Sequence, residues 1–141
     1  MTGKLLLILA LVCPAVSQSV TPVVVECGLK CSGQFTVSNN TTKPLVAVVT
    51  PYAFTVKDKH VYTAPVDSKN LVILDQASAR LSPMGTHTFS YKIFCATEPC
   101  RTQLLTGIMV GKSGGVEVWV KIPHNVYSCK KQKGCRERAL Q

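Results

Sequence analysis

The sequence predicts an all-β fold, an immunoglobulin-like sandwich of about seven strands in a single domain with local disulfides. Short β-branched runs alternate with turn residues between positions 23 and 122, a pattern typical of sandwiches. No segment of this stretch carries apolar residues at helical spacing over three turns. Six of the cysteines form three closely spaced pairs, and the chain is long enough for one hydrophobic core but not two.

The strand signals are runs rich in valine, isoleucine, threonine and aromatic residues, each ended by turn residues. The run at 44–50 is apolar on both faces, so we expect a central strand that Pro51 ends. Residues 82–85 (SPMG) form a β-turn sequence, because proline fixes φ at the second position and glycine suits the last. The candidate strand runs are residues 23–25, 34–38, 44–50, 54–56, 61–63, 71–74, 86–94, 104–110 and 116–122.

Two of these runs alternate cleanly between apolar and polar residues, so each has a distinct apolar face. In the run at 86–94 that face holds His87, Phe89, Tyr91 and Ile93. After a glycine-rich turn at 111–115, the apolar face of the last run holds Val116, Val118, Val120 and Ile122. Its other face holds Glu117, Trp119 and Lys121. The alternation by itself suits a core-packing strand, in which case Trp119 and Lys121 point outward and Trp119 is a candidate contact residue.

The N-terminus predicts a signal peptide. Lys4 supplies a positive charge, an apolar run follows at 5–12, and Ala15 and Ser17 are small residues at the positions that signal peptidase reads. We therefore expect residues 1–17 to be removed and the mature protein to be periplasmic or extracellular. The run is too short to cross a bilayer and no second one follows, so no transmembrane segment is expected. A lipoprotein signal ending at Cys13 is the weaker alternative, because such signals place a small residue where Val12 stands.

The cysteine count supports an oxidising destination. Of the seven cysteines, Cys13 falls in the predicted signal peptide and an even number remains. Six cysteines allow 15 pairings, but their spacing favours local loop staples, above all Cys95–Cys100 and Cys129–Cys135. A zinc site is the alternative, but only one pair has suitable spacing and no metal is expected. The candidate disulfide residues are Cys27, Cys31, Cys95, Cys100, Cys129 and Cys135.

The formal net charge is +9, and much of it lies in the predicted tail at 129–141. The domain proper therefore spans residues 18–128. The tail is either a solvated terminus or a contact for an acidic surface. Nucleic acid is not an expected partner, because the protein is predicted to be exported and has few aromatic residues. The basic residues of the tail are Lys130, Lys131, Lys133, Arg136 and Arg138.

No arrangement typical of an enzyme is found, so neither catalytic residues nor a cofactor is expected. His60, His87 and His124 are scattered and have no metal or triad spacing, so we expect ordinary surface or strand residues. The segment at 107–113 (GIMVGKS) resembles a phosphate-binding loop, but its glycines are one residue too close. A predicted strand, not a helix, follows it.

Residues 39–42 (NNTT) contain two overlapping acceptor sequences for N-linked glycan, Asn39-Asn40-Thr41 and Asn40-Thr41-Thr42. A plain polar turn is the alternative interpretation, because asparagine tolerates the left-handed conformation that turns use. From the sequence alone the plain turn is the favoured interpretation.

Two segments resemble one known family. Residues 35–50 (FTVSNNTTKPLVAVVT) are similar to the opening of periplasmic pilus chaperones and their single-domain relatives, where an asparagine-rich turn joins two strands. Residues 79–89 (ARLSPMGTHTF) resemble that family's turn of arginine, an aliphatic residue, Ser/Glu-Pro-x-Gly and the strand that follows. The likeness extends over roughly residues 34–123, the N-terminal immunoglobulin-like domain of these chaperones.

The resemblance implies that the protein binds a partner by β-strand addition. Such chaperones lend the last strand of this domain to an incomplete subunit, whose groove takes the alternate apolar side chains. The matching strand here is residues 116–122, and Lys121 followed by Ile122 is the nearest match to the family's anchor for the partner's terminal carboxylate. The family's second anchor, an arginine of the first strand, has no counterpart, because Lys30 is the only basic residue in 20–31. The two-domain length, the cysteine pairs and the tail also differ.

We therefore predict an exported, non-enzymatic, chaperone-like domain whose partner is a pilin-like or envelope-complex subunit. The predicted partner-binding residues are Val116, Val118, Trp119, Val120, Lys121 and Ile122. The alternative is a structural subunit of an envelope, secretion or surface-appendage assembly, held by the same strand edges and by its basic tail.

Overall fold

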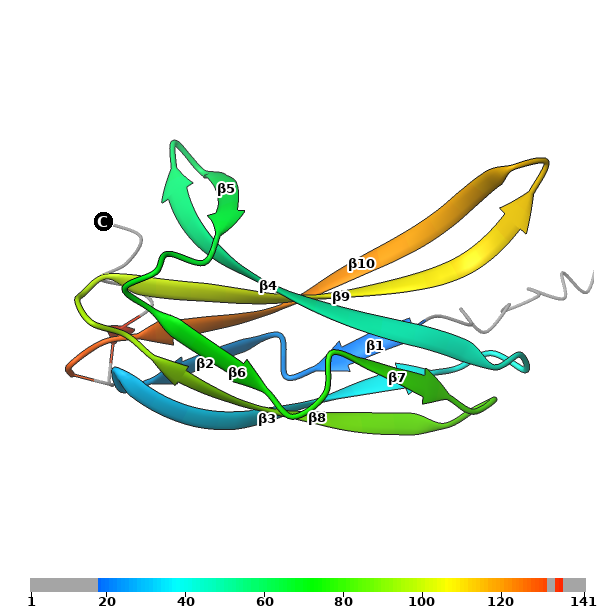
Figure 1. Ribbon diagram of the computed structural model, residues 1–141, viewed down its shortest axis with the longest axis horizontal. Helices are drawn as coiled ribbons and strands as arrows, with labels where there is room; N and C mark the ends of the chain where they lie inside the picture. The colour runs from blue at the N-terminus through cyan, green and yellow to red at the C-terminus, as the bar shows by residue number, and fades with distance from the viewer. Residues whose placement is uncertain (1–17, 132–133, 136–141) are drawn as a thin grey trace, which may run out of the picture.

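A computed structural model describes residues 18–131 and 134–135 and shows ten strands in two packed sheets (Figure 1). The all-β prediction is therefore confirmed, with more strands than the sequence indicated. The strands are β1 (Gln18–Thr21), β2 (Val24–Cys27), β3 (Lys30–Asn39), β4 (Leu45–Lys57), β5 (His60–Pro65), β6 (Leu71–Leu74), β7 (Ser78–Leu81), β8 (Thr86–Phe94), β9 (Cys100–Ser113) and β10 (Val116–Ser128).

One sheet has the strand order β1-β3-β8-β6, and the other has the order β2-β10-β9-β4-β5, with β7 also paired to β4. The chain passes from the first sheet to the second between β1 and β2. As a result β2 runs parallel to β10, while the other pairings are antiparallel. The described part of the chain contains no helix long and apolar enough to cross a membrane.

The core lies between the sheets and is built by alternate residues of each strand. The predicted apolar face of residues 86–94 is confirmed, since Phe89, Tyr91 and Ile93 are buried. Phe89 stacks on Phe35 of β3, with ring centroids 5.4 Å apart. The alternation of apolar and polar residues in β8 therefore predicts the buried face correctly, because a second sheet covers this face along most of the strand.

His124 of β10 is fully buried in this core, where the sequence suggested an ordinary surface or strand residue. Its Nδ1 donates to the carbonyl oxygen of Pro22 at 2.6 Å, and its Nε2 accepts from the hydroxyl of Tyr91 at 2.8 Å. Both ring nitrogens of the neutral tautomer therefore have partners. Burial lowers the pKa of His124 and raises the pKa of Tyr91 to about 12.

The strand β4 corrects the expectation that Pro51 ends the second main strand. It continues without interruption to Lys57. One edge of β4 pairs with β7 only up to Val48 and with β5 only from Tyr52 onward, so Pro51 lies in the gap between them. The missing N–H of proline therefore costs no ladder bond on that edge.

The three disulfides are local, as the spacing predicted, and they join Cys27 to Cys31, Cys95 to Cys100, and Cys129 to Cys135. All three gather at one end of the sandwich. There Ser128 pairs with Cys27 on one side and with Cys100 on the other. The backbone N–H of Cys129 donates to the carbonyl of Cys27 at 3.0 Å, and that of Cys95 to Leu29 at 2.8 Å.

Part of the predicted tail packs on the sandwich. Cys129 and Cys135 are buried in a small second cluster with Phe54 of β4 and Tyr127 of β10. The rings of Phe54 and Tyr127 meet edge to face, with centroids 5.3 Å apart. The predicted signal peptide and the residues from 136 onward lie outside the described residues.

Candidate functional site

The longest hairpin of the protein, β9 with β10, projects beyond the rest of the sandwich (Figure 1). Its turn is two residues long, Gly114 and Gly115, with φ angles of +57° and +81°. Successive positive φ angles define the primed turn that matches the right-handed twist of a hairpin, and glycine adopts them without steric cost. The sequence predicted a glycine-rich turn over 111–115, but the strand pairing continues to Ser113 and Val116.

The predicted valine face runs from the core out along this projection. Val120 lies opposite Ile108, which is buried, and Ile122 packs against the main core. Val116 and Val118 continue the stripe into solvent, with exposed fractions of 65% and 53%. The interpretation that all four residues pack in the core is therefore wrong for Val116 and Val118, because the hairpin extends past the sheet that covers the rest of this face.

The same strand has a free edge. β10 pairs with β9 along its full length, but on its other side β2 pairs only with residues 125–128. Residues 116–123 consequently have no ladder partner on that edge within residues 18–131 and 134–135. Their outward N–H and C=O groups form a template for a further strand, and Pro123, which has no N–H, lies where the β2 pairing takes over.

The opposite face of β10 carries Trp119 and Lys121, both exposed as predicted. The Trp119 Nε1–H donates to a carboxylate oxygen of Glu117 at 3.2 Å, and Glu117 pairs with Lys112 of β9 at 3.5 Å. The indole ring lies beside Gly107, where an added Cβ would be 3.6 Å from it. Trp119 is thus held against the sheet while 44% of its surface remains exposed.

Sequence reasoning missed the neighbours of Trp119 on this outer face of the six-stranded sheet. Val46 and Val48 of β4 and Met109 of β9 are also exposed, and Met109 lies opposite Trp119. The sequence signal was the run at 44–50, whose two faces are both apolar and which therefore indicated a strand buried on both faces. In the structure β4 is central in its sheet, but no second layer of the described residues covers these side chains. A small hollow of about 150 Å³ lies here, lined by Val48, Thr50, Tyr52, Leu105, Gly107, Trp119 and Lys121.

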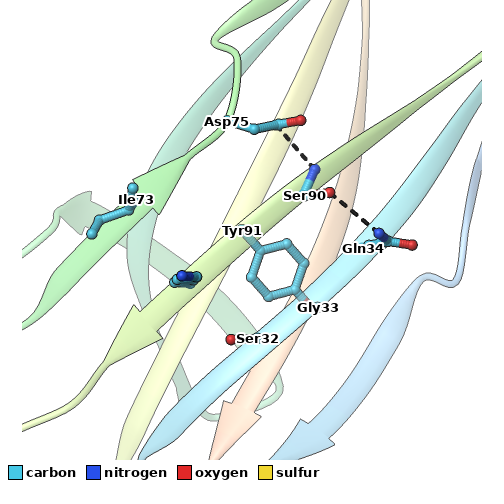
Figure 2. A pocket seen from close by; sticks show the side chains of 8 residues that line it. Ser32, Gly33, Gln34, Ile73, Asp75, Ser90 and Tyr91 are labelled. Atoms are coloured by element: carbon cyan, nitrogen blue, oxygen red, sulfur yellow. Dashed lines mark hydrogen bonds between the residues drawn. The ribbon is translucent and has the colours of Figure 1, made fainter.

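A wider, shallow hollow of about 490 Å³ lies on the outer face of the other sheet. Figure 2 shows that Asp75 and Gln34 both reach toward Ser90 there. A carboxylate oxygen of Asp75 accepts from the Ser90 N–H at 3.0 Å, and the Gln34 amide donates to the Ser90 hydroxyl at 3.4 Å. These polar groups bind one another and form no nucleophile–base pair. The hollow is lined by Ser32, Gly33, Gln34, Ile73, Asp75, Ser90, Tyr91 and Lys92.

The basic residues of the tail are only partly described. Lys130 and Lys131 are exposed, and the backbone N–H of Lys130 donates to the carboxylate of Glu98 in the Cys95–Cys100 loop. Both lysines lie at the disulfide end, whereas the valines lie at the tip of the projecting hairpin (Figure 1). Lys133, Arg136 and Arg138 lie outside the described residues.

No protein-family model matches this sequence, and no curated protein matches it. Similar solved structures include the E. coli chaperone DraB, with a TM-score of 0.56, 13% identity, and coverage of 81% of this chain and 55% of that chain. A chain of the Acinetobacter baumannii CsuC–CsuE chaperone–tip adhesion subunit complex has a TM-score of 0.58, 10% identity, and coverage of 87% and 57%. A C. elegans member of the MSP family has a TM-score of 0.56, 7% identity, and coverage of 79% and 97%.

The predicted resemblance to pilus chaperones is thus confirmed at the level of the fold. At these identities the likeness concerns the fold alone. The chain spans little more than half the length of the chaperone chains it matches, in contrast to the MSP-family structure, which it spans almost completely.

Proposed function

We propose that this protein is an exported, non-enzymatic domain that binds another protein by β-strand addition along the free edge of β10. The observation that carries the proposal is the coincidence of an unpaired edge at 116–123 with a stripe of exposed valines on the same strand. The fold shared with pilus chaperones supports it. Periplasmic or extracellular location belongs to the same proposal and is supported by the three disulfides.

Strand addition uses two features of β10 at once. The outward backbone groups of residues 116–123 bond to a partner strand, which supplies affinity without dependence on sequence. The alternate side chains Val116 and Val118 enter a groove of the partner, which fixes the register because a slip by one residue would present Glu117 instead. Burying each valine fully contributes about 1.5 kcal/mol or less, because each is already partly covered.

The partner's chemistry follows from this surface. It is a protein whose own sheet or sandwich lacks a strand, such as a pilin-like or envelope-complex subunit. Lys121 is exposed beside the edge, and we propose that it binds a carboxylate of the partner, as the resemblance implies. The missing arginine anchor leaves Lys121 to bind the carboxylate singly, so we expect a weaker contribution from this contact than from the valine stripe.

A cross-linking experiment in the native host tests the proposal. A photo-reactive amino acid replaces Val118 in one version and Val61 of β5 in another. The two valines are similarly exposed, at 53% and 57%, but Val61 lies on a different hairpin. We expect one protein to cross-link through position 118 and not through position 61. Mass spectrometry then identifies it for reconstitution with the purified full chain.

Variants of the reconstituted pair give the decisive measurement. Val118→Glu should weaken binding at least tenfold, because a charge would enter an apolar groove, and Trp119→Glu should weaken it less. Val61→Glu is the matched control and should bind normally. Amides in residues 116–123 should exchange more slowly in the complex. Unchanged exchange there, together with normal binding by folded Val118→Glu, would exclude β10 as the binding edge.

A further inference from the structure

The turn between β3 and β4 contains the two overlapping glycan acceptor sequences, and the structure places their asparagines in opposite environments. Asn39 ends β3 and is fully buried, whereas Asn40 is exposed. The turn lies at the end of the molecule opposite the disulfides (Figure 1). The difference decides which of the two side chains can carry a modification in the folded protein.

The side chain of Asn39 is fully used in holding two turns together. Its Nδ2 donates to the carbonyl of Lys43 at 2.7 Å and to that of Ser82, in the β7–β8 turn, at 3.1 Å. Its Oδ1 accepts from the N–H of Thr41 at 3.0 Å and from the Thr41 hydroxyl at 2.6 Å. A sugar on Nδ2 would replace one of the two donor hydrogens and has no room at a fully buried atom. Modification of Asn39 is therefore incompatible with this fold.

Asn40 lies in the same turn without that restriction. Its side chain is exposed, and so is that of Thr42, which completes its acceptor sequence. The turn around it is fixed by backbone bonds, because the Asn39 N–H donates to the carbonyl of Gly85 at 2.8 Å and the Met84 N–H donates to that of Thr41 at 3.0 Å. A group attached at Asn40 would project into solvent and break none of these contacts.

We infer that Asn40 is an acceptor for N-linked oligosaccharide and that Asn39 is not. The donor is a polyprenyl-diphosphate-linked oligosaccharide presented by an oligosaccharyltransferase in the compartment that receives the chain. The Asn40 amide nitrogen forms a bond to C1 of the first sugar, the bond from C1 to the diphosphate oxygen breaks, and the amide loses one proton. The polyprenyl diphosphate leaves with the bonding electrons, so no oxidant or reductant is required.

The transferase meets the chain before it folds, when both asparagines are accessible. The structure acts afterwards, because a chain modified on Asn39 cannot make both the bond to Lys43 and the bond to Ser82, and its buried side chain leaves no room for the sugar, so it does not reach the native state. Chains modified on Asn39 are therefore absent from the folded protein. Protease-resistant protein should carry its oligosaccharide on Asn40 alone.

The test uses the full chain in a eukaryotic secretory cell, once with its own N-terminal segment and once with a proven secretory signal placed before Gln18. Folded protein is collected by its resistance to protease. It is then deglycosylated with an amidase in heavy-oxygen water, which labels any asparagine that carried a sugar. We expect a single oligosaccharide per molecule and the label at Asn40.

Three variants separate the two acceptor sequences. Asn40→Gln keeps the Asn39 sequence intact, and Thr42→Ala removes only the acceptor sequence of Asn40, so folded protein of both should lose the oligosaccharide completely. Thr41→Ser keeps both sequences and a hydroxyl for Asn39, so it should remain modified. The inference is overturned by a label at Asn39 or an oligosaccharide on folded Asn40→Gln. Unmodified wild-type protein secreted from the proven signal overturns it equally.

Discussion

At the residue scale, His124 connects three parts of the core that are distant in sequence. It belongs to β10, donates to Pro22 where the chain changes sheets, and accepts from Tyr91 of β8. Its ring also stacks on Phe35, with centroids 4.9 Å apart. The residues of the surrounding core cluster carry no charge. The bond to the Pro22 carbonyl favours the protonated form, but the effect of burial is larger and lowers the pKa. Burial is accordingly the main reason for its lowered pKa.

This predicts how stability depends on pH. The unfolded chain takes up a proton on His124 near its ordinary pKa of 6.5, while the folded protein takes it up only at lower pH. The unfolded state therefore binds more protons between these values, so the free energy of unfolding is highest above pH 6.5 and falls as the pH is lowered. Urea unfolding at pH 7.5 and at pH 5 measures the fall.

Two variants assign that fall to His124. His124→Gln should show a smaller fall between the two pH values, although it is less stable at both because the ring stacking is lost. His60 lies at the exposed start of β5. In His60→Gln the free energy of unfolding should therefore decrease between the two pH values by as much as in the wild type. An unchanged fall in His124→Gln would mean that other groups govern the acid sensitivity.

At the scale of elements, the β9–β10 hairpin combines a firmly paired ladder with a tip that no other described part of the chain covers. Lys112 and Glu117 bridge the two strands close to the turn. A register shift between Val118 and Trp119 marks a bulge, which increases the local twist of a hairpin. The edge that we propose for binding is therefore carried by a local structure whose geometry depends on the two-glycine turn.

Substitution at this turn should affect the hairpin more than the fold. Gly114→Ala forces an alanine into a left-handed conformation at a cost of about 1 kcal/mol, although an added Cβ meets no atom within 4 Å. We expect faster amide exchange in the tip of the hairpin and weaker partner binding, with a small change in global unfolding. Gly114→Asn is the control, because asparagine tolerates this φ. Equal effects of both variants would show that the backbone conformation is not the cause.

At the scale of the whole molecule, the three disulfides and the proposed binding edge lie at opposite ends of the sandwich. One disulfide joins the end of β2 to the start of β3, a second joins the end of β8 to the start of β9, and the third closes a loop after β10, while the hairpin tip projects from the other end (Figure 1). Cys129–Cys135 also closes a loop over Phe54 and Tyr127. A long free edge can thus extend from a domain whose opposite end carries three local disulfides.

Removing the last disulfide tests this separation. The double variant Cys129→Ser with Cys135→Ser should lower the free energy of unfolding by about 2 kcal/mol, the amount expected for a short closed loop. Amide exchange should quicken near Tyr127 and Ser128, where β2 pairs with β10. Exchange in residues 116–123 and partner binding should remain normal. Loss of binding in a folded double variant would contradict the independence of the two ends.

Much of the fold was predictable because it depends on local pattern. Alternation in residues 86–94 gave the correct buried face, and the close spacing of Cys95 and Cys100 indicated a local disulfide. The short strands β1 and β7 were missed, because four residues carry too little periodic signal. The length of β4 was missed because whether a proline interrupts a ladder depends on which edge its nitrogen faces.

The sequence by itself determined the all-β class, the local cysteine pairs and the strand whose valines share one face. Only the tertiary structure decided which of two similar alternating strands is covered, since Phe89 of β8 is buried while Val118 of β10 is exposed. Periodicity tells which side chains share a face, but not whether a second sheet reaches it. The same limit applies to Asn39 and Asn40, which are identical residues until the β7–β8 turn buries one of them.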